Sequence, residues 1–244
     1  MIDYLYDGTF EGLLCCVFAH YYEEKAAGIF RQADYQPTML HAARAVATDA
    51  EKAARVYGAI REKISSFDLE RVYTAFLSSA PEKEMKILHY VVLGFREGAQ
   101  VSRLHGHPVV FDLQRIEQKV HREIHRFTGL VRFSVLKGEV LYAPIEPDHD
   151  IIERLAGHFC DRFKCDPFII HDRKRGKALI AKDGDWVISD FDESLLPALS
   201  EGEEAARRLW KNYFGATAIR ERTNPRCQKN FMPVRYWKNL TETQ

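Results

Sequence analysis

The sequence predicts an α+β protein with a helical N-terminal half, an antiparallel β-β-α-β-β-β sheet in the middle, and a C-terminal helix followed by an irregular basic arm. Apolar residues recur at helical spacing before residue 128, whereas strict alternation begins at Val131. Asn-Pro and Met-Pro pairs interrupt the pattern near the C-terminus. We therefore expect a mostly helical region over residues 1–128 and an α+β region with the basic arm over residues 129–244, joined in one compact unit.

The N-terminal half is expected to hold one short strand followed by helices. Residues 2–6 alternate in polarity up to an Asp-Gly turn, which is typical of a strand. Thr9 can cap the first helix, and Gly28 is expected to end this first unit. Further helices are expected from caps at Thr48 and Asp68, from about residue 79, and over residues 110–126.

The sheet is expected between Val131 and Asp190, with its helix on one face. Alternation over residues 131–135 and a Lys-Gly turn predict a first hairpin, and the Asp-Gly pair at 183–184 predicts a second. Asp148 is expected to cap the helix between these hairpins. Ser200 and Glu203 form a capping box that predicts the last helix.

Global composition is that of an ordinary globular protein. The net charge is zero and the pI is about 7.1, so no overall charge favours a nucleic acid or a membrane. No apolar run approaches the ~20 residues of a membrane span. The first ten residues contain Asp3 and Asp7 and lack the basic residues with which a signal peptide begins. We expect a cytoplasmic protein with no membrane partner.

Cysteine, histidine and glycine patterns predict neither a metal nor a cofactor. The five cysteines are odd in number and Cys15 and Cys16 are adjacent, which favours free thiols. His121 and His125 share a helical face but lack the zinc-protease pattern H-E-x-x-H. The phosphate loop of ATPases and the dinucleotide-binding glycine motif are both absent from the sequence.

Basic residues concentrate near the C-terminus. Residues 205–238 carry about +8, and the rest of the chain carries about −8. The nine cations are Arg207, Arg208, Lys211, Arg220, Arg222, Arg226, Lys229, Arg235 and Lys238, interleaved with Trp210, Tyr213, Phe214, Phe231, Tyr236 and Trp237. Such a segment can contact phosphates and stack on unpaired bases. It can equally pair with the protein's own carboxylates, and the sequence leaves both interpretations open.

Separate motifs along the chain resemble the bacterial DUF4130 family, described as "probable DNA metabolism protein". They are Tyr6–Gly12 (YDGTFEG), His125–Phe133 (HRFTGLVRF), Leu141–Ile151 (LYAPIEPDHDI), His158–Phe163 (HFCDRF), His171–Arg175 (HDRKR), Arg222–Cys227 (RTNPRC) and Asn230–Leu240 (NFMPVRYWKNL). The resemblance spans essentially the whole chain and is weaker over residues 52–64.

The resemblance implies a role in DNA metabolism or repair by association. Similar domains occur joined to uracil-DNA glycosylase-like domains, and their genes tend to accompany a radical-SAM protein. Glycosylase activity is not expected of this chain, and radical chemistry would belong to the partner because the cluster cysteines are missing. We therefore expect an accessory protein that binds DNA and cooperates with a radical-SAM partner.

Two sets of candidate site residues follow. The candidate nucleic-acid-binding residues are Arg173, Lys174, Arg220, Arg222, Arg226, Lys229, Arg235, Trp237 and Lys238. The alternative is an enzyme acting on a nucleic acid or nucleotide, with side chains that transfer protons or hold phosphate. Its candidate catalytic residues are His125, Arg132, Glu146, His158, Arg162, His171, Asp172 and Arg175. If this alternative holds, their side chains should line one pocket.

Overall fold

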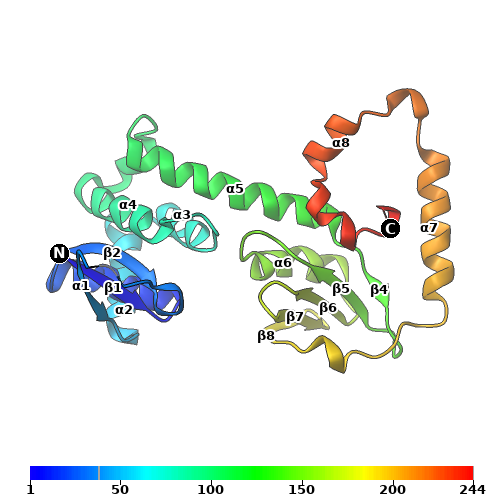
Figure 1. Ribbon diagram of the computed structural model, residues 1–244, viewed down its shortest axis with the longest axis horizontal. Helices are drawn as coiled ribbons and strands as arrows, with labels where there is room; N and C mark the ends of the chain where they lie inside the picture. The colour runs from blue at the N-terminus through cyan, green and yellow to red at the C-terminus, as the bar shows by residue number, and fades with distance from the viewer. Residues whose placement is uncertain (38, 244) are drawn as a thin grey trace. The chain divides into compact units, whose positions relative to one another are not determined.

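The computed structural model describes residues 1–37 and 39–243. The chain forms two compact units, Met1–His121 and Arg122–Gln244, called here the N-terminal and C-terminal units. Figure 1 shows their helices and strands. Helix α5 (Pro108–Leu130) contributes residues to both units. Helices and strands occur in both, so the expected α+β class is confirmed.

The N-terminal unit contains a three-stranded parallel sheet in the order β2-β1-β3. Its strands are β1 (Ile2–Tyr6), β2 (Ala26–Arg31) and β3 (Ala42–Ala45). The expectation of a single strand followed only by helices is therefore wrong. Gly28 lies within β2, where a Cβ atom would lie 2.3 Å from the ring of Phe30. The missing side chain makes room for that ring, so this glycine serves packing rather than helix termination.

The first helix of this unit begins at the expected cap, Thr9, whereas two others begin at caps that differ from those expected. The helices before α5 are α1 (Phe10–Tyr22), α2 (Ala50–Lys63), α3 (Ser66–Phe76) and α4 (Lys83–Glu97), with 3₁₀ helices at Gln32–Asp34 and Gly98–Arg103. Asp49, not Thr48, caps α2, and Thr48 donates a hydrogen bond to Asp7 instead. Ser65, not Asp68, caps α3.

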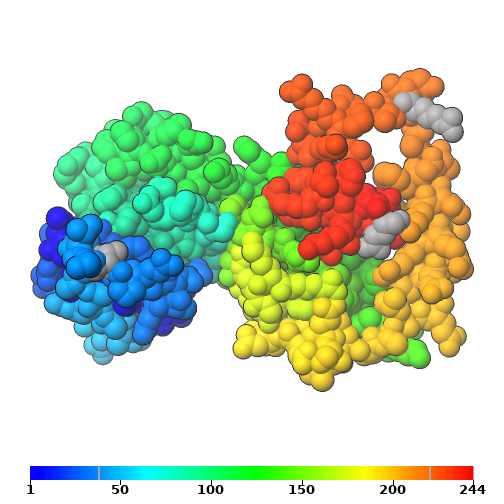
Figure 2. Space-filling view, in the orientation of Figure 1, coloured from blue at the N-terminus to red at the C-terminus, as the bar shows by residue number. Residues whose placement is uncertain are grey.

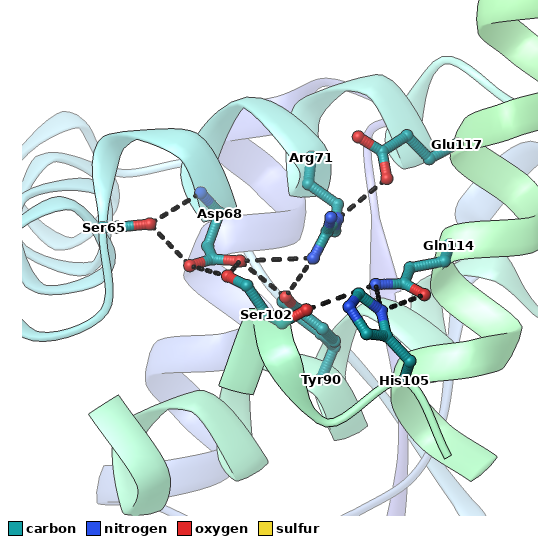
Figure 3. A network of polar contacts seen from close by, with 8 residues as sticks. All are labelled: Ser65, Asp68, Arg71, Tyr90, Ser102, His105, Gln114 and Glu117. Carbon is teal, nitrogen blue, oxygen red and sulfur yellow. Dashed lines mark hydrogen bonds and ion pairs between the residues drawn. The ribbon is translucent and has the colours of Figure 1, made fainter. Parts of the chain in front are cut away.

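Asp68 is fully buried at the centre of a polar network (Figure 3). Its carboxylate accepts hydrogen bonds from Tyr90 Oη at 2.6 Å and from Ser102 Oγ at 2.7 Å, and Arg71 Nη1 lies 3.5 Å away. Arg71 also donates to Glu117 on α5 at 2.8 Å. The network joins α3, α4 and α5. Because its donors and acceptors bond to one another, we interpret it as a structural network rather than as a ligand site.

The C-terminal unit contains a five-stranded mixed sheet in the order β4-β5-β6-β7-β8. Its strands are β4 (Ser134–Val135), β5 (Leu141–Ile145), β6 (Phe168–Asp172), β7 (Lys177–Lys182) and β8 (Asp185–Asp190). The expected antiparallel sheet is wrong at one place, because β5 and β6 are parallel. Helix α6 (Ile152–Arg162) connects these two strands, and a helical crossover returns the chain to run in the same direction. The N-cap of α6 is Ile151 rather than Asp148.

Aromatic rings fill the space between α6 and the sheet. The ring of Phe133 lies 5.4 Å from that of Phe159 and 4.8 Å from that of Phe163. Phe159 and Phe168 are almost fully buried. This cluster fixes the backbone around residue 133, and so positions Arg132 and Ser134 on either side of it.

The chain ends in helices rather than in an irregular arm. Helix α7 (Glu203–Thr217) is followed by α8 (Pro225–Phe231), with 3₁₀ helices at Glu193–Leu195, Arg220–Arg222, Val234–Asn239 and Thr241–Thr243. The expected capping box is wrong, since Gly202 is the N-cap of α7. Within residues 1–37 and 39–243, no helix combines the length and the apolar character that a bilayer span requires.

Candidate functional site

Two adjoining cavities lie in the C-terminal unit. The tryptophan cavity, of about 560 Å³, is lined by Gly129, Val131, Arg132, Phe133, Val135, Arg162, Phe163, Glu203, Ala206, Arg207, Trp210 and Thr241. The arginine cavity, of about 280 Å³, is lined by Arg132, Ser134, Tyr142, Pro144, Arg173, Leu199, Arg207, Lys238, Asn239 and Thr241. They share Arg132, Arg207 and Thr241, so together they form one groove, called here the cationic groove. In Figure 2 the surfaces of α7 (orange) and of the C-terminal segment (red) lie beside each other.

Arg132 links the groove to the C-terminal segment. Its Nη2 donates to Glu242 Oε1 at 2.6 Å, and its guanidinium lies 5.8 Å from the ring centre of Trp210. Trp210 Nε1 donates to the same carboxylate at 3.0 Å. Burial opposes ionisation of Glu242, but the bonds from Arg132 and Trp210 hold its pKa below the ordinary value. Glu242 therefore remains an anion that fixes both side chains.

Arg207 attaches the first turn of α7 to the edge of the sheet. Its Nε donates to Glu203 at 2.8 Å and its Nη2 donates to Ser134 Oγ at 2.6 Å. Glu203 also accepts a bond from the backbone N–H of Val135 at 2.9 Å. Burial raises the pKa of Glu203, but this bond and the bonds from Arg207 and Ser134 outweigh it, so the pKa is lowered. The guanidinium is thus held in place by Glu203, which lines the tryptophan cavity, and by Ser134, which lines the arginine cavity.

Arg173 and Lys238 approach the arginine cavity from two other elements. Arg173 follows β6 and forms two hydrogen bonds to Glu193. Lys238, in the 3₁₀ helix Val234–Asn239, bonds to Glu146. The residues that line this cavity include four cations and no carboxylate. Each of these cations pairs with an acidic side chain that does not line this cavity.

Tyr142 and His171 form a buried pair at the wall of the arginine cavity. The phenol oxygen of Tyr142 lies 2.9 Å from His171 Nδ1. Burial lowers the pKa of His171, so its imidazole is neutral near pH 7. Burial raises the pKa of Tyr142 to about 12, which keeps the phenol protonated. Both groups are therefore uncharged near pH 7 and within hydrogen-bonding distance of each other.

Asp172 and Arg175, both candidate catalytic residues, hold the loops at the ends of β5 and β6. Asp172 is fully buried and accepts from Arg175 Nη1 at 2.7 Å and from the backbone N–H of Lys174 at 3.0 Å. Arg175 also donates to the carbonyls of Pro147 and Asp148. Burial raises the pKa of Asp172, against the opposing effect of Arg175. Neither residue lines the groove.

The eight candidate catalytic residues are not gathered in one pocket. Arg132 and Arg162 line the tryptophan cavity, and His171 lies behind Tyr142. His125 on α5 and His158 on α6 are exposed and line neither cavity. Glu146 is present only as the partner of Lys238. Their catalytic role remains a prediction.

The candidate nucleic-acid-binding residues divide into two groups. Arg222, Arg226 and Lys229 are exposed, with no ion pair among the residues that the structure describes. Arg235 pairs with Asp148 at 2.7 Å, Lys238 pairs with Glu146, and Trp237 Nε1 donates to the carbonyl of Met232. Lys174 is exposed and Arg173 lines the arginine cavity. The side chain of Arg220 lies outside the described residues.

Several groove residues are absent from the sequence-based candidates. Arg207 and Trp210 are counted in the basic segment but are not singled out, although their i, i+3 spacing places them near each other on one helix. Ser134 and Thr241 belong to no motif, and Tyr142 lies in the motif Leu141–Ile151 but is not among the candidate residues. Their position in the groove depends on tertiary contacts between segments far apart in the chain.

Comparison with known proteins supplies a family and no activity. No curated protein matches the chain. A solved structure of PggH, a pGpG-specific phosphodiesterase from Vibrio cholerae, aligns with 89% of this chain and 100% of its own, at 9% identity and a TM-score of 0.36. The model of a family described as a domain of unknown function, DUF4130, matches residues 81–242, which include every residue of the cationic groove. The chain therefore belongs to the DUF4130 family.

Proposed function

We propose that the C-terminal unit binds single-stranded nucleic acid in the cationic groove, and that DNA is the strand it binds. The observation that supports this proposal most strongly is the lining of the arginine cavity, which contains four cations and no carboxylate. The cations are Arg132, Arg173, Arg207 and Lys238. Cations at fixed positions bind phosphate oxygens without first having to be ordered. The resemblance to DNA metabolism proteins supports DNA over RNA.

The tryptophan cavity supplies a surface for an unpaired base. Trp210 is 39% exposed, and Phe163 and Arg162 line the same cavity. A base stacked on an aromatic ring contributes roughly 1–3 kcal/mol to binding and requires no particular sequence. A duplex keeps its bases stacked inside, so this cavity favours a single strand.

The exposed cations near α8 extend the proposed contact surface. Arg222, Arg226 and Lys229 carry charge that can neutralise phosphates along a longer strand. Arg235 and Lys238 pair with carboxylates of the same unit, as the intramolecular interpretation of the basic segment expects. We propose phosphate contact for the three exposed cations and, at the arginine cavity, for Lys238, whose partner Glu146 does not line that cavity.

A radical-SAM partner is proposed on the family resemblance alone. Co-expression of the two proteins and purification through a tag on this chain would test it. We expect a complex of constant stoichiometry on gel filtration; separate elution of the two proteins would count against the partnership.

Nucleic-acid binding is tested by fluorescence anisotropy with a labelled single-stranded oligonucleotide. Substituting Trp210→Ala should weaken binding by roughly 5- to 150-fold, because one stacked base is lost. Trp186→Ala is the matched control, since Trp186 on β8 is 45% exposed and lines neither cavity. Equal affinity of the two variants would contradict the proposed stacking surface.

A second candidate function is an enzyme acting on a nucleic acid or nucleotide, favoured by the Tyr142–His171 pair. A neutral imidazole 2.9 Å from a phenol at a cationic cavity can accept a proton during reaction of a bound phosphate ester. Tyr142→Phe would then retain binding and lose turnover of a nucleotide or oligonucleotide substrate by about 10²-fold or more. If the wild-type protein turns over none of these substrates, this candidate fails.

A further inference from the structure

We propose that the arginine cavity is a site for a phosphomonoester, the terminal phosphate of a nucleotide or of a strand end, with the attached nucleoside in the tryptophan cavity. This inference rests on the proposed function, because it specifies which part of the nucleic acid each cavity receives. The two compartments differ in chemistry. The arginine cavity is lined by four cations and by hydroxyl groups, and of the described residues only Tyr142 adds an aromatic ring to that lining. The tryptophan cavity adds the rings of Phe133, Phe163 and Trp210 to a lining that also holds three arginines and Glu203.

Four cations line the arginine cavity, and each pairs with a carboxylate that is not part of that lining. An internal phosphodiester carries one negative charge, whereas a phosphomonoester carries about −1.5 to −2 at pH 7 and offers three terminal oxygens. Arg173, Arg207 and Lys238 reach the cavity from three separate elements, after β6, on α7 and in the 3₁₀ helix Val234–Asn239. Cations on several sides match a compact dianion better than an extended chain of monoanions.

Donors remain at this cavity after the internal bonds are made. The guanidinium of Arg207 has five N–H donors, and its bonds to Glu203 and Ser134 use one at Nε and one at Nη2. Ser134, Thr241 and Asn239 add hydroxyl and amide groups to the lining. A phosphate with three terminal oxygens can therefore accept several charge-assisted bonds at once.

The residues that line both cavities determine where the nucleoside would bind. Arg132, Arg207 and Thr241 line both cavities, so a group bound in one lies next to the opening of the other. Arg132 packs against Trp210, which keeps the indole ring in the tryptophan cavity. A sugar bound at the shared wall would place its base beside the indole.

Six ligands test this assignment on the full-length protein: an oligonucleotide with a 5′-phosphate, the same strand with a 3′-phosphate, the unphosphorylated strand, a nucleoside 5′-monophosphate, the nucleoside, and inorganic phosphate. We expect one phosphorylated end to bind about tenfold or more tightly than the unphosphorylated strand. We also expect the monophosphate, but not the nucleoside, to displace it. The preferred end, or a preference for the free nucleotide, identifies the source of the phosphate.

Substitutions assign the compartments separately. Arg173→Gln and Lys238→Gln alter exposed side chains and should remove the preference for a phosphorylated end, while Lys182→Gln, an exposed lysine on β7 outside both cavities, should preserve it. Trp210→Ala should lower the affinity for the nucleoside monophosphate by about fivefold or more. It should leave competition by inorganic phosphate unchanged. Thermal unfolding of each variant without ligand shows that the fold is retained.

The outcomes separate this inference from the proposed function. Binding of all strands with equal affinity, whether phosphorylated or not, would overturn the phosphomonoester site and leave nucleic-acid binding intact. If Trp210→Ala lowers the affinities for inorganic phosphate and for the nucleotide equally, the assignment of phosphate and nucleoside to separate cavities is wrong. Absence of binding by every strand would overturn both.

Discussion

Replacing Asp68 by alanine should lower the free energy of unfolding of the N-terminal unit by about 3–5 kcal/mol. The substitution leaves the guanidinium of Arg71, whose side chain is 6% exposed, with Glu117 as its one carboxylate partner among the described residues. It also removes the acceptor of Tyr90 and Ser102 inside the unit (Figure 3). Buried donors that lose their acceptor retain their full desolvation cost.

Hydrogen exchange is the suitable measurement for this variant. All three tryptophans, Trp186, Trp210 and Trp237, lie in the C-terminal unit, so tryptophan fluorescence does not report the N-terminal unit directly. Amides of α3 and α4 should lose protection in Asp68→Ala. Asp112→Ala, an exposed carboxylate on α5, should change their protection by about 0.5 kcal/mol or less. Equal protection in the two variants would contradict the structural role of the network.

Replacing Glu123 by alanine should destabilise the C-terminal unit by about 2–4 kcal/mol and weaken nucleic-acid binding as well. Glu123 is 3% exposed and accepts from the backbone N–H groups of Asp148 and His149 at 2.8 and 2.7 Å. It also accepts from the phenol of Tyr236, which belongs to the same 3₁₀ helix as Lys238. Loss of this carboxylate therefore releases the segment that places Lys238 in the groove.

Tryptophan fluorescence during urea unfolding measures this effect, because it reports the C-terminal unit. Tyr236→Phe removes one bond to Glu123 and keeps the ring that packs on Phe127, so its cost should be only about 1 kcal/mol. Arg122→Ala, at an exposed neighbouring position on α5, is the control. A Glu123→Ala variant as stable as this control would show that Glu123 does not anchor the segment.

Local patterns in the sequence predict most helices, and miss what depends on pairing between distant segments. Helical periodicity identifies α4 because its buried residues recur at helical spacing. It also identifies α1, although residues 12–17 of that helix are all buried and its apolar residues therefore face more than one side. Strand β2 escapes detection because Ala26, Ala27 and Gly28 have low strand propensity, and pairing with β1 decides their conformation. The parallel pairing of β5 and β6 follows from the intervening helix, a rule that the antiparallel expectation overlooks.

The candidate site shows the same division. Positive charge near the C-terminus is visible in the sequence, but the pairing of each cation is not. Lys238 bonds to Glu146, 92 positions earlier, and Arg132 bonds to Glu242, 110 positions later. Only the fold shows that the carboxylates paired with these cations lie outside the lining of the arginine cavity, which is the feature that supports phosphate binding.

The salt dependence of binding tests most directly whether the groove cations contact phosphates. The logarithm of the affinity for a single-stranded oligonucleotide should fall linearly with the logarithm of salt concentration. Because each phosphate contact contributes about −0.7 to this slope, the double variant Arg173→Gln, Lys238→Gln should reduce its magnitude by about 1.4. An unchanged slope, or no binding by the wild-type protein at low salt, would contradict the account.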